Sequence, residues 1–230
     1  MYELWIANKN YSSWSLRPWV LMTTLGIPFE ERQVPFGRGS NWDSFRAFSP
    51  SGTVPTLRDS DNVVWDSVGI AEYLAERHPG VWPGDPAARA WARCAAAEMH
   101  SSFGTLRSRC PMSCGTRVEL TEIPPELERD VARIDEIWNQ GLGRFGGSFL
   151  AGSDFTAVDA FFAPVAFRIQ GYGLKLGDVA SAYATKLLEL PAMKQWYEAA
   201  LAEAWREPGH EEEIAATGRL VLDLRRPVQP

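Results

Sequence analysis

Three serine hydroxyls lie close together near the start of the chain, in the segment Ser12-Ser13-Trp14-Ser15. The segment follows a short apolar run at residues 4–7 and leads into a helical pattern. A turn from a strand into a helix leaves backbone N–H groups without intrahelical partners, and these groups and the helix dipole favour a bound anion. Serine is also a preferred helix cap, and taken by itself the segment favours this structural role.

Two other segments carry residues suited to binding. Val54-Pro55 precedes an apolar, strand-like stretch, and Asp66-Ser67 stands where a helical pattern begins. Asp and Ser are both common caps, and a helix start is also a ready anion site. Taken alone, Asp66-Ser67 fits capping and binding equally, whereas its spacing after Val54-Pro55 favours binding.

The elements that position these residues follow from periodicity and turn residues. A strand, a helix and a second strand occur within about 35 residues, which predicts a right-handed βαβ unit with parallel strands. Pro18 falls in the expected first turn of that helix, where a missing N–H costs little, and Gly26 ends it. The predicted strands are residues 2–7, 29–34, 53–57 and 63–65, and the predicted helices are residues 15–25, 42–48 and 68–77.

The segment from His78 to Pro86 carries three prolines and two glycines, which indicates a linker. Beyond it the pattern is helical almost throughout, and the tail after Glu207 is polar and expected to wrap the surface. An α/β unit followed by a helical unit predicts two domains, residues 1–80 and 87–230, joined by residues 81–86. The later predicted helices run from 87 to about 110, from 125 to about 145, and onward from 156 and from 191.

Composition limits the possible functions. The chain has 230 residues, 45% hydrophobic and 23% charged, with a net charge of -6, which is ordinary for a globular protein and argues against nucleic-acid binding. Three cysteines without metal-type spacing predict reduced thiols in the cytoplasm and no metal. We expect no membrane segment, because no apolar run is long enough.

The serine-rich turn, Val54-Pro55 and Asp66-Ser67 occur in an order that resembles the cytosolic glutathione transferases over nearly the whole chain. The resemblance implies a thioredoxin-like N-terminal domain (βαβ-α-ββα) and an all-helical C-terminal domain. Residues 12–17 resemble the serine motif of the zeta class and its bacterial, maleylacetoacetate isomerase-like relatives. Residues 53–57 resemble the family's cis-proline segment, and residues 66–74 resemble its glutathione-anchoring helix start. Residues 156–159 resemble the capping box of a buried helix in the second domain.

The resemblance also assigns roles in binding glutathione. Val54, before a cis Pro55, would pair with the cysteinyl backbone, and Ser67 would bind the γ-glutamyl carboxylate at a helix start. Asp66 would face the γ-glutamyl ammonium, and Trp14 would lie against the tripeptide. In the second domain, Asp159 would reach back to the N–H of Thr156 as a capping box does.

Ser12 is the residue that the motif implies as hydrogen-bond donor to the glutathione sulfur. Ser13 and Ser15 could share the task, and the phenol of Tyr11 is a further candidate, by analogy with classes that use tyrosine. A thiol titrates near about 8.5. A hydrogen bond to the anion supplies roughly 1.5–3 kcal/mol and a helix N-terminus about 0.3–1, which together lower the pKa by about one or two units.

Two features depart from the zeta pattern. Trp14 stands where that motif has cysteine, and Thr53 stands where the family often has a basic or amide side chain. The glycyl carboxylate therefore has Arg38, Asn41 and Trp42 as candidate partners. The absence of a cysteine in the first turn disfavours disulfide exchange of the glutaredoxin or omega type.

The electrophile is expected between the two domains, where pockets often form. Its candidate walls are Tyr11, Met99, Phe103, Arg107 and Met112, although inter-helix core is an equally good interpretation of the last four. The resemblance implies an enzyme that ionises glutathione and adds it to, or uses it to isomerise, a small hydrophobic electrophile, in a two-fold homodimer. The alternative is a binding or regulatory protein on the same fold.

Overall fold

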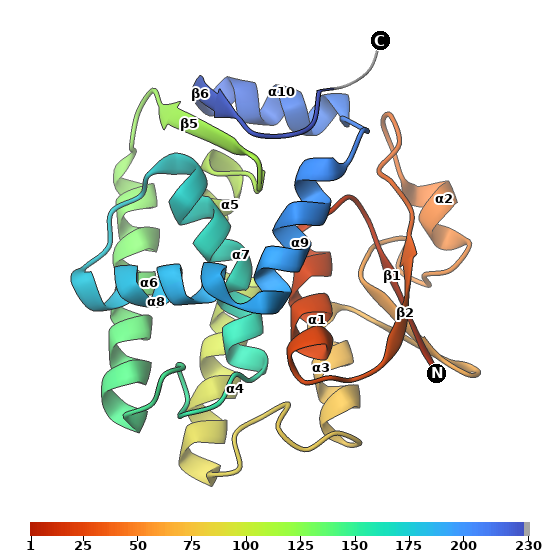
Figure 1. The fold of residues 1–230 in the computed structure, drawn as a ribbon, viewed down its shortest axis with the longest axis vertical. Coiled ribbons are helices and arrows are strands. Elements are labelled where there is room, and N and C mark those ends of the chain that lie inside the picture. Colours follow the sequence, from red (N-terminus) through yellow and green to blue (C-terminus); the bar gives the residue numbers. More distant parts are fainter. Residues whose placement is uncertain (228–230) are drawn as a thin grey trace.

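The computed structural model describes residues 1–227. Its N-terminal part is a four-stranded sheet in the order β2-β1-β3-β4, in which β1 runs parallel to β2 and antiparallel to β3. In Figure 1 these elements occupy the red-to-orange side of the molecule. They are β1 (Tyr2–Ile6), α1 (Ser13–Thr24), β2 (Phe29–Gln33), α2 (Trp42–Arg46), β3 (Thr56–Asp59), β4 (Asn62–Trp65) and α3 (Ser67–Ala75).

The central strand β1 fixes where the serine-rich turn lies. Leu4 and Ile6 are completely buried, and Leu4 stands between Glu31 of β2 and Leu57 of β3. Apolar side chains on a central strand remove surface from water and hold the strand in register. The chain therefore leaves the middle of the sheet at Ala7 and enters α1 at the point where the two parts of the molecule meet.

Helix α1 begins two residues earlier than the sequence predicted, at Ser13, so Pro18 lies inside the helix and not in its first turn. A proline inside a helix removes one i→i−4 hydrogen bond. Helix α1 nevertheless continues to Thr24, because its buried face packs against α3, α7 and α9.

The rest of the described chain is mostly helical and lies beside the sheet (Figure 1). Helix α7 is buried along almost its whole length and packs against α1, α4 and α8. The elements are α4 (Pro86–Ser101), α5 (Gly104–Arg109), β5 (Thr116–Leu120), α6 (Pro125–Phe145), α7 (Ala157–Tyr172), α8 (Asp178–Glu189), α9 (Pro191–Ala202), α10 (Pro208–Thr217) and β6 (Gly218–Asp223).

The capping box expected at the start of α7 is present. The Asp159 carboxylate accepts the Thr156 N–H at 2.9 Å, and it also accepts the Leu150 N–H at 3.0 Å and the Tyr183 hydroxyl at 2.6 Å. Burial raises the pKa of Asp159, whereas these hydrogen bonds act in the opposite direction. The carboxylate ties α7, α8 and the loop before α7 together.

One prediction about the helical part was wrong. The single helix expected from 87 to about 110 is divided into α4 and α5, because Ser102 is extended and Phe103 has a left-handed φ of 60°. The side chain of Arg107 occupies this break and donates to the carbonyls of His100 and Ser102.

The tail after Glu207 is more than a polar surface wrap. It forms α10 and β6, and β6 pairs antiparallel with β5, so the C-terminal part is not purely helical. In Figure 1 the blue α10 and β6 lie across one end of the molecule, near α5 and α9. No helix within residues 1–227 is long and apolar enough to cross a membrane.

Candidate functional site

The serine-rich turn holds its three hydroxyls in different environments. Ser15 is completely buried; its Oγ accepts the Ala7 N–H at 3.3 Å and the Ser12 hydroxyl at 2.7 Å. Ser12 and Ser13 line a cavity of about 510 Å³, whereas Ser15 is not among its lining residues. Ser15 therefore supports Ser12 from behind.

Ser12 occupies the N-cap position of α1, but its side chain makes no capping hydrogen bond. The purely structural explanation of this serine, helix capping, is thus not what the fold uses. A hydroxyl is both donor and acceptor. If Ser15 turns its own O–H toward the Ser12 Oγ, the Ser12 proton becomes free for a group in the cavity.

The peptide bond between Val54 and Pro55 is cis, as the family resemblance implied. Val54 lines both the 510 Å³ cavity and a second hollow of about 320 Å³. Trp14 and Thr53 also line both, so the two hollows adjoin at these three residues, and together they are called the cleft here. Within residues 1–227, no hydrogen bond engages the N–H or the C=O of Val54.

The second hollow ends at Asp66 and Ser67, the start of α3. Asp66 caps this helix, since its carboxylate accepts the Val68 N–H at 2.9 Å, and it holds a positive φ of 68°. Such backbone strain in a non-glycine residue is typical of functional sites. Ser67 is 2% exposed, and its hydroxyl has no partner among the described residues.

His100 of α4 closes the same hollow. Its Nε2 lies 3.6 Å from the Asp66 carboxylate, and its ring meets the Trp14 ring edge to face, with centroids 5.1 Å apart. Burial, together with the nearby Arg17 and Arg107, lowers the pKa of His100 despite the attraction of Asp66. His100 was not predicted as a site residue, because a lone histidine in an alanine-rich helix carries no recognisable signal.

The far wall of the cavity comes from the C-terminal segment. His210 and Glu213 of α10 line it, and the His210 ring stacks between Tyr11 and Phe36, with centroids 4.8 Å from each. His210 Nδ1 pairs with Glu207 at 2.7 Å. The tail was predicted only to wrap the surface, and nothing in its polar sequence indicated this position.

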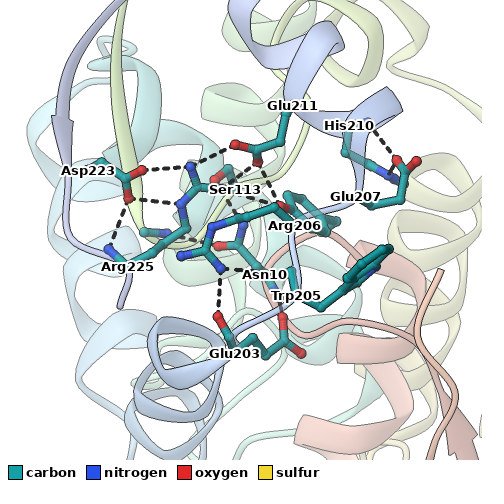
Figure 2. Close-up of polar contacts among 12 residues, drawn as sticks. Asn10, Ser113, Glu203, Trp205, Arg206, Glu207, His210, Glu211, Asp223 and Arg225 are labelled. Carbon is teal, nitrogen blue, oxygen red and sulfur yellow. Dashed lines mark hydrogen bonds and ion pairs between the residues drawn. The ribbon is translucent and has the colours of Figure 1, made fainter. Parts of the chain in front are cut away.

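Figure 2 shows the polar contacts that hold this C-terminal segment in place. Arg225 lies between Glu211 and Asp223, with ion pairs of 2.5 and 2.7 Å. Tyr11 donates its hydroxyl proton to Glu211 at 2.7 Å, and burial raises its pKa. Tyr11 lines the cavity, but its only proton is committed to Glu211, which disfavours it as donor to a thiol.

Glu203 makes a second attachment. Its carboxylate accepts the N–H groups of Lys9 and Asn10 at 2.6 and 3.2 Å, directly before the serines. Asn10 in turn donates to Ser113 at 3.3 Å (Figure 2). The backbone that carries the serine hydroxyls is thus fixed by residues from the other end of the chain.

The predicted electrophile walls are only partly brought together. Arg107 and Met112 line the cavity, whereas Met99 and Phe103 are buried and do not. Among the candidates for the glycyl carboxylate, Asn41 and Trp42 line the cavity, but Arg38 is exposed and lies outside it. Arg38 lies between Gly37 and Gly39 in a loop, and the sequence did not show in which direction this loop turns.

Arg168 of α7 also lines the cavity, and it was not predicted. It is buried, and its Nη2 lies 3.4 Å from the Ser13 Oγ. A lone arginine within the otherwise apolar stretch of residues 160–169 was an available signal, since such charges are rarely buried without a role.

The cysteines take no part in the cleft. Cys110 and Cys114 are buried free thiols, and burial raises the pKa of Cys110 to about 12. A protonated, enclosed thiol is a poor nucleophile. Cys94 is free and exposed, away from the cavity-lining residues.

A thioredoxin-like sheet joined to a helical part, with a cleft lined by a cis-proline segment and by residues at two helix starts, is the arrangement of the glutathione transferase fold. Two family models match the chain: glutathione S-transferase, N-terminal domain, at residues 11–77, and glutathione S-transferase, C-terminal domain, at residues 124–199. Together they span more than half of the chain. The protein belongs to the glutathione S-transferase family.

Individual relatives are distant and carry different names. A stringent starvation protein A homolog of Pasteurella multocida is 28% identical over 64% of this chain and 68% of its own length. A zeta-class glutathione S-transferase of Euphorbia esula is 27% identical over 66% and 70%. Glutathione S-transferase theta-3 of Mus musculus is 28% identical over 81% and 78%. These relatives do not single out the zeta class.

Solved structures show the same fold. A diazinon-metabolizing glutathione S-transferase of Bombyx mori matches with a TM-score of 0.69 and 17% identity, over 93% of this chain and 99% of that one. A glutathione transferase homolog from Burkholderia, with bound glutathione, matches with a TM-score of 0.62 and 22% identity, over 86% and 97%.

Proposed function

We propose that this protein is a glutathione transferase that binds glutathione along the cleft, ionises its thiol at Ser12 and transfers the thiolate to a small electrophile. The observation that carries the proposal is the placement of two hydroxyls, of Ser12 and Ser67, at the two parts of one cleft, on either side of Val54-Pro55. Neither hydroxyl caps the helix at whose start it stands.

The proposed binding mode uses each end of the cleft differently. The unpartnered Ser67 hydroxyl and the start of α3 take the γ-glutamyl carboxylate, and Asp66 takes the ammonium. The free N–H and C=O of Val54 pair with the cysteinyl backbone. The glycyl carboxylate reaches the side chains of Asn41 and Trp42, and the sulfur lies over Ser12.

The Ser12 hydroxyl then stabilises the thiolate. A hydrogen bond to an anion is worth about 1.5–3 kcal/mol and the start of α1 adds about 0.3–1, so the thiol pKa falls by about one to two units from its usual value. The thiolate attacks the electrophilic carbon. With an aryl halide, the new C–S bond forms as halide leaves, and the thiol proton goes to solvent.

A spectrophotometric conjugation assay with glutathione and chlorodinitrobenzene, a generic aryl halide, tests this proposal. We expect turnover by the wild-type protein, ultraviolet thiolate absorbance when glutathione binds at neutral pH, and a loss of roughly ten- to hundredfold in kcat/KM in Ser12→Ala. Unchanged rates in Ser12→Ala would remove Ser12 from its role. Calorimetry that detects no uptake at millimolar glutathione would overturn the function itself.

Two alternatives have specific support. Relatives named stringent starvation protein A homolog favour a binding or regulatory protein, which predicts no thiolate absorbance with glutathione. A probable maleylacetoacetate isomerase of Caenorhabditis elegans, 23% identical over 76% of this chain, favours a glutathione-dependent isomerase. Direct assay of that isomerisation separates it from conjugation. We also propose a two-fold dimer, from the family resemblance, which sedimentation analysis would test.

A further inference from the structure

His210 of α10 has its ring held on three sides. The Tyr11 and Phe36 rings lie against it, each with its centroid 4.8 Å from that of His210. The Nδ1 atom of His210 lies 2.7 Å from the Glu207 carboxylate, a contact that Figure 2 shows. The edge of the ring that carries Nε2 is therefore the side left for a ligand in the cavity that His210 lines.

The Nε2 atom of His210 is accessible as well as unpaired. Within residues 1–227 it forms no hydrogen bond, and it is not one of the enclosed polar atoms that lack a partner. A ring nitrogen that is open to solvent and has no partner in the protein is free to exchange a proton with a bound molecule.

The Glu207 carboxylate decides which nitrogen of His210 exchanges that proton. Burial raises the pKa of Glu207, but hydrogen bonds from the Gly209 and His210 N–H groups and from the His210 ring outweigh burial and lower it. An ionised carboxylate only accepts hydrogen bonds, so Nδ1 keeps its proton in the neutral and in the charged imidazole. Every gain or loss of a proton therefore takes place at Nε2, and the carboxylate fixes the direction in which Nε2 points.

The other titratable groups near this ring are engaged or exposed. Tyr11 donates its only proton to Glu211 at 2.7 Å, and burial raises the pKa of that phenol. Glu213, which lines the same cavity from α10, is exposed to water. Among the described residues on this wall, His210 is thus the side chain suited to proton transfer.

A proton donor on this wall matters for one kind of electrophile. When a thiolate adds to an α,β-unsaturated carbonyl compound, the C–S bond forms at the β-carbon and the C=C electron pair moves toward the carbonyl oxygen. The resulting enolate becomes a stable product only when it takes up a proton. Substitution on an aryl halide needs no such proton, because the halide leaves with the electron pair. The two reactions therefore differ in their need for a proton donor.

We propose that His210, held by Glu207, is the proton donor that completes the conjugate addition of glutathione to α,β-unsaturated carbonyl compounds. The Nε2–H of the imidazolium protonates the enolate as the C–S bond forms, and the neutral imidazole then recovers a proton from solvent. His210 is a catalytic residue in this step and Glu207 a positioning residue. The inference rests on the proposed function, since Ser12, which would hold the thiolate, lines the same cavity.

Two substrates that differ in their need for a proton give the direct test. They are phenylbutenone, an α,β-unsaturated ketone, and chlorodinitrobenzene, and the measured quantity is the ratio of their kcat/KM values. General acid catalysis contributes roughly 10²–10⁴ in rate, so His210→Gln should lower this ratio about hundredfold. A fall of less than about tenfold overturns the proposal, because loss of packing alone would slow both reactions alike.

Two further variants assign the effect to the pair. Glu207→Gln retains an oxygen for the two N–H groups at the start of α10 but removes the charge, and should lower the ratio about tenfold. This variant also serves if His210→Gln does not fold. His78→Gln is the matched control, because His78 pairs with the Tyr2 hydroxyl at 2.9 Å and lies outside the cavity. An equal fall in His78→Gln, or an unchanged ratio in Glu207→Gln, contradicts the assignment.

Chemical rescue distinguishes proton transfer from packing. His210→Ala leaves a gap beside the Tyr11 and Phe36 rings. Added imidazole should restore turnover of phenylbutenone, whereas pyrrole, which has the same ring size and no basic nitrogen, should not. Equal restoration by both compounds, or none by imidazole, contradicts proton transfer at this position.

The same assays separate this inference from the proposed function. Turnover of chlorodinitrobenzene without turnover of phenylbutenone overturns the role of His210 and keeps the transferase. Turnover of neither substrate overturns the transferase. If phenylbutenone alone is turned over, its kcat/KM in His210→Gln relative to His78→Gln replaces the ratio and gives the same decision.

Discussion

Replacing Ser67 with alanine should affect the free protein and its glutathione complex in opposite directions. The Ser67 hydroxyl is 2% exposed and has no hydrogen-bond partner among the described residues. Helix α3 does not depend on it, because the neighbouring Asp66 caps the helix at the Val68 N–H. Removing the hydroxyl therefore breaks no contact within the protein.

The magnitudes follow from this environment. A buried polar group left without a partner costs about 1–3 kcal/mol, so Ser67→Ala should raise the free energy of unfolding by about 1 kcal/mol or leave it unchanged. A hydrogen bond to a carboxylate contributes roughly 1.5–3 kcal/mol. Loss of that bond should weaken glutathione binding by about ten- to hundredfold.

Urea unfolding and glutathione titration calorimetry measure the two effects on one preparation. Ser49→Ala is the matched control, since Ser49 is also completely buried in the same part of the chain but its hydroxyl pairs with Ser51 at 3.1 Å. We expect Ser49→Ala to lower stability by about 1 kcal/mol and to leave glutathione affinity within about threefold.

The reasoning about Ser67 has two separate points of failure. If Ser67→Ala binds glutathione as tightly as the wild type, the α3 end of the cleft does not hold the γ-glutamyl carboxylate. If Ser67→Ala unfolds more easily than Ser49→Ala, the hydroxyl serves the fold and not a ligand.

Three further outcomes follow from other contacts. Tyr11→Phe should keep kcat/KM within about threefold and lose about 1 kcal/mol of stability by urea unfolding, because its proton serves Glu211; a hundredfold loss of activity would restore the phenol as thiol donor. Asp159→Ala should cost about 3–5 kcal/mol in the same measurement, since it leaves two N–H groups and the Tyr183 hydroxyl unpaired; a cost below about 1 would contradict this. Burial raises the pKa of Glu211, but hydrogen bonds from Arg225 and Tyr11 outweigh burial and hold the pKa below 4.5. The stabilisation that these bonds give is therefore complete above about pH 4.5 and lost as the pH falls. Hydrogen exchange in α10 should accelerate in acid before that of the rest of the chain, and uniform exchange would contradict this reasoning.

The N-terminal part of the fold was predictable because its signals are local. Alternation, turn residues and an apolar helical face place β1, α1 and β2 within one or two residues of the structure. The error at Pro18 has a tertiary origin. Proline is unfavourable inside an isolated helix, and only the packing of α1 against α3, α7 and α9 stabilises it there.

The C-terminal segment was not predictable by the same means. Helix α10 is short and has almost no apolar face, and β6 exposes most of its residues. Its position depends on contacts between residues about 200 apart, such as Tyr11 with Glu211 and Arg225. Charged residues that pair at this separation leave no periodic pattern in the sequence.

This difference separates two kinds of specificity in the cleft. The part of the cleft that we propose for glutathione is lined by Val54, Asp66 and Ser67, whose positions depend on local backbone geometry, and so a short motif was enough to predict that they lie together. The part that we propose for the electrophile combines Arg107, Arg168 and residues of α10, which meet only when the fold is complete. We therefore expect a motif to indicate the co-substrate of such a protein, whereas side chains that distant segments bring together decide the second substrate. Relatives that share the motif and differ in α10 should accordingly differ in electrophile and agree in glutathione binding.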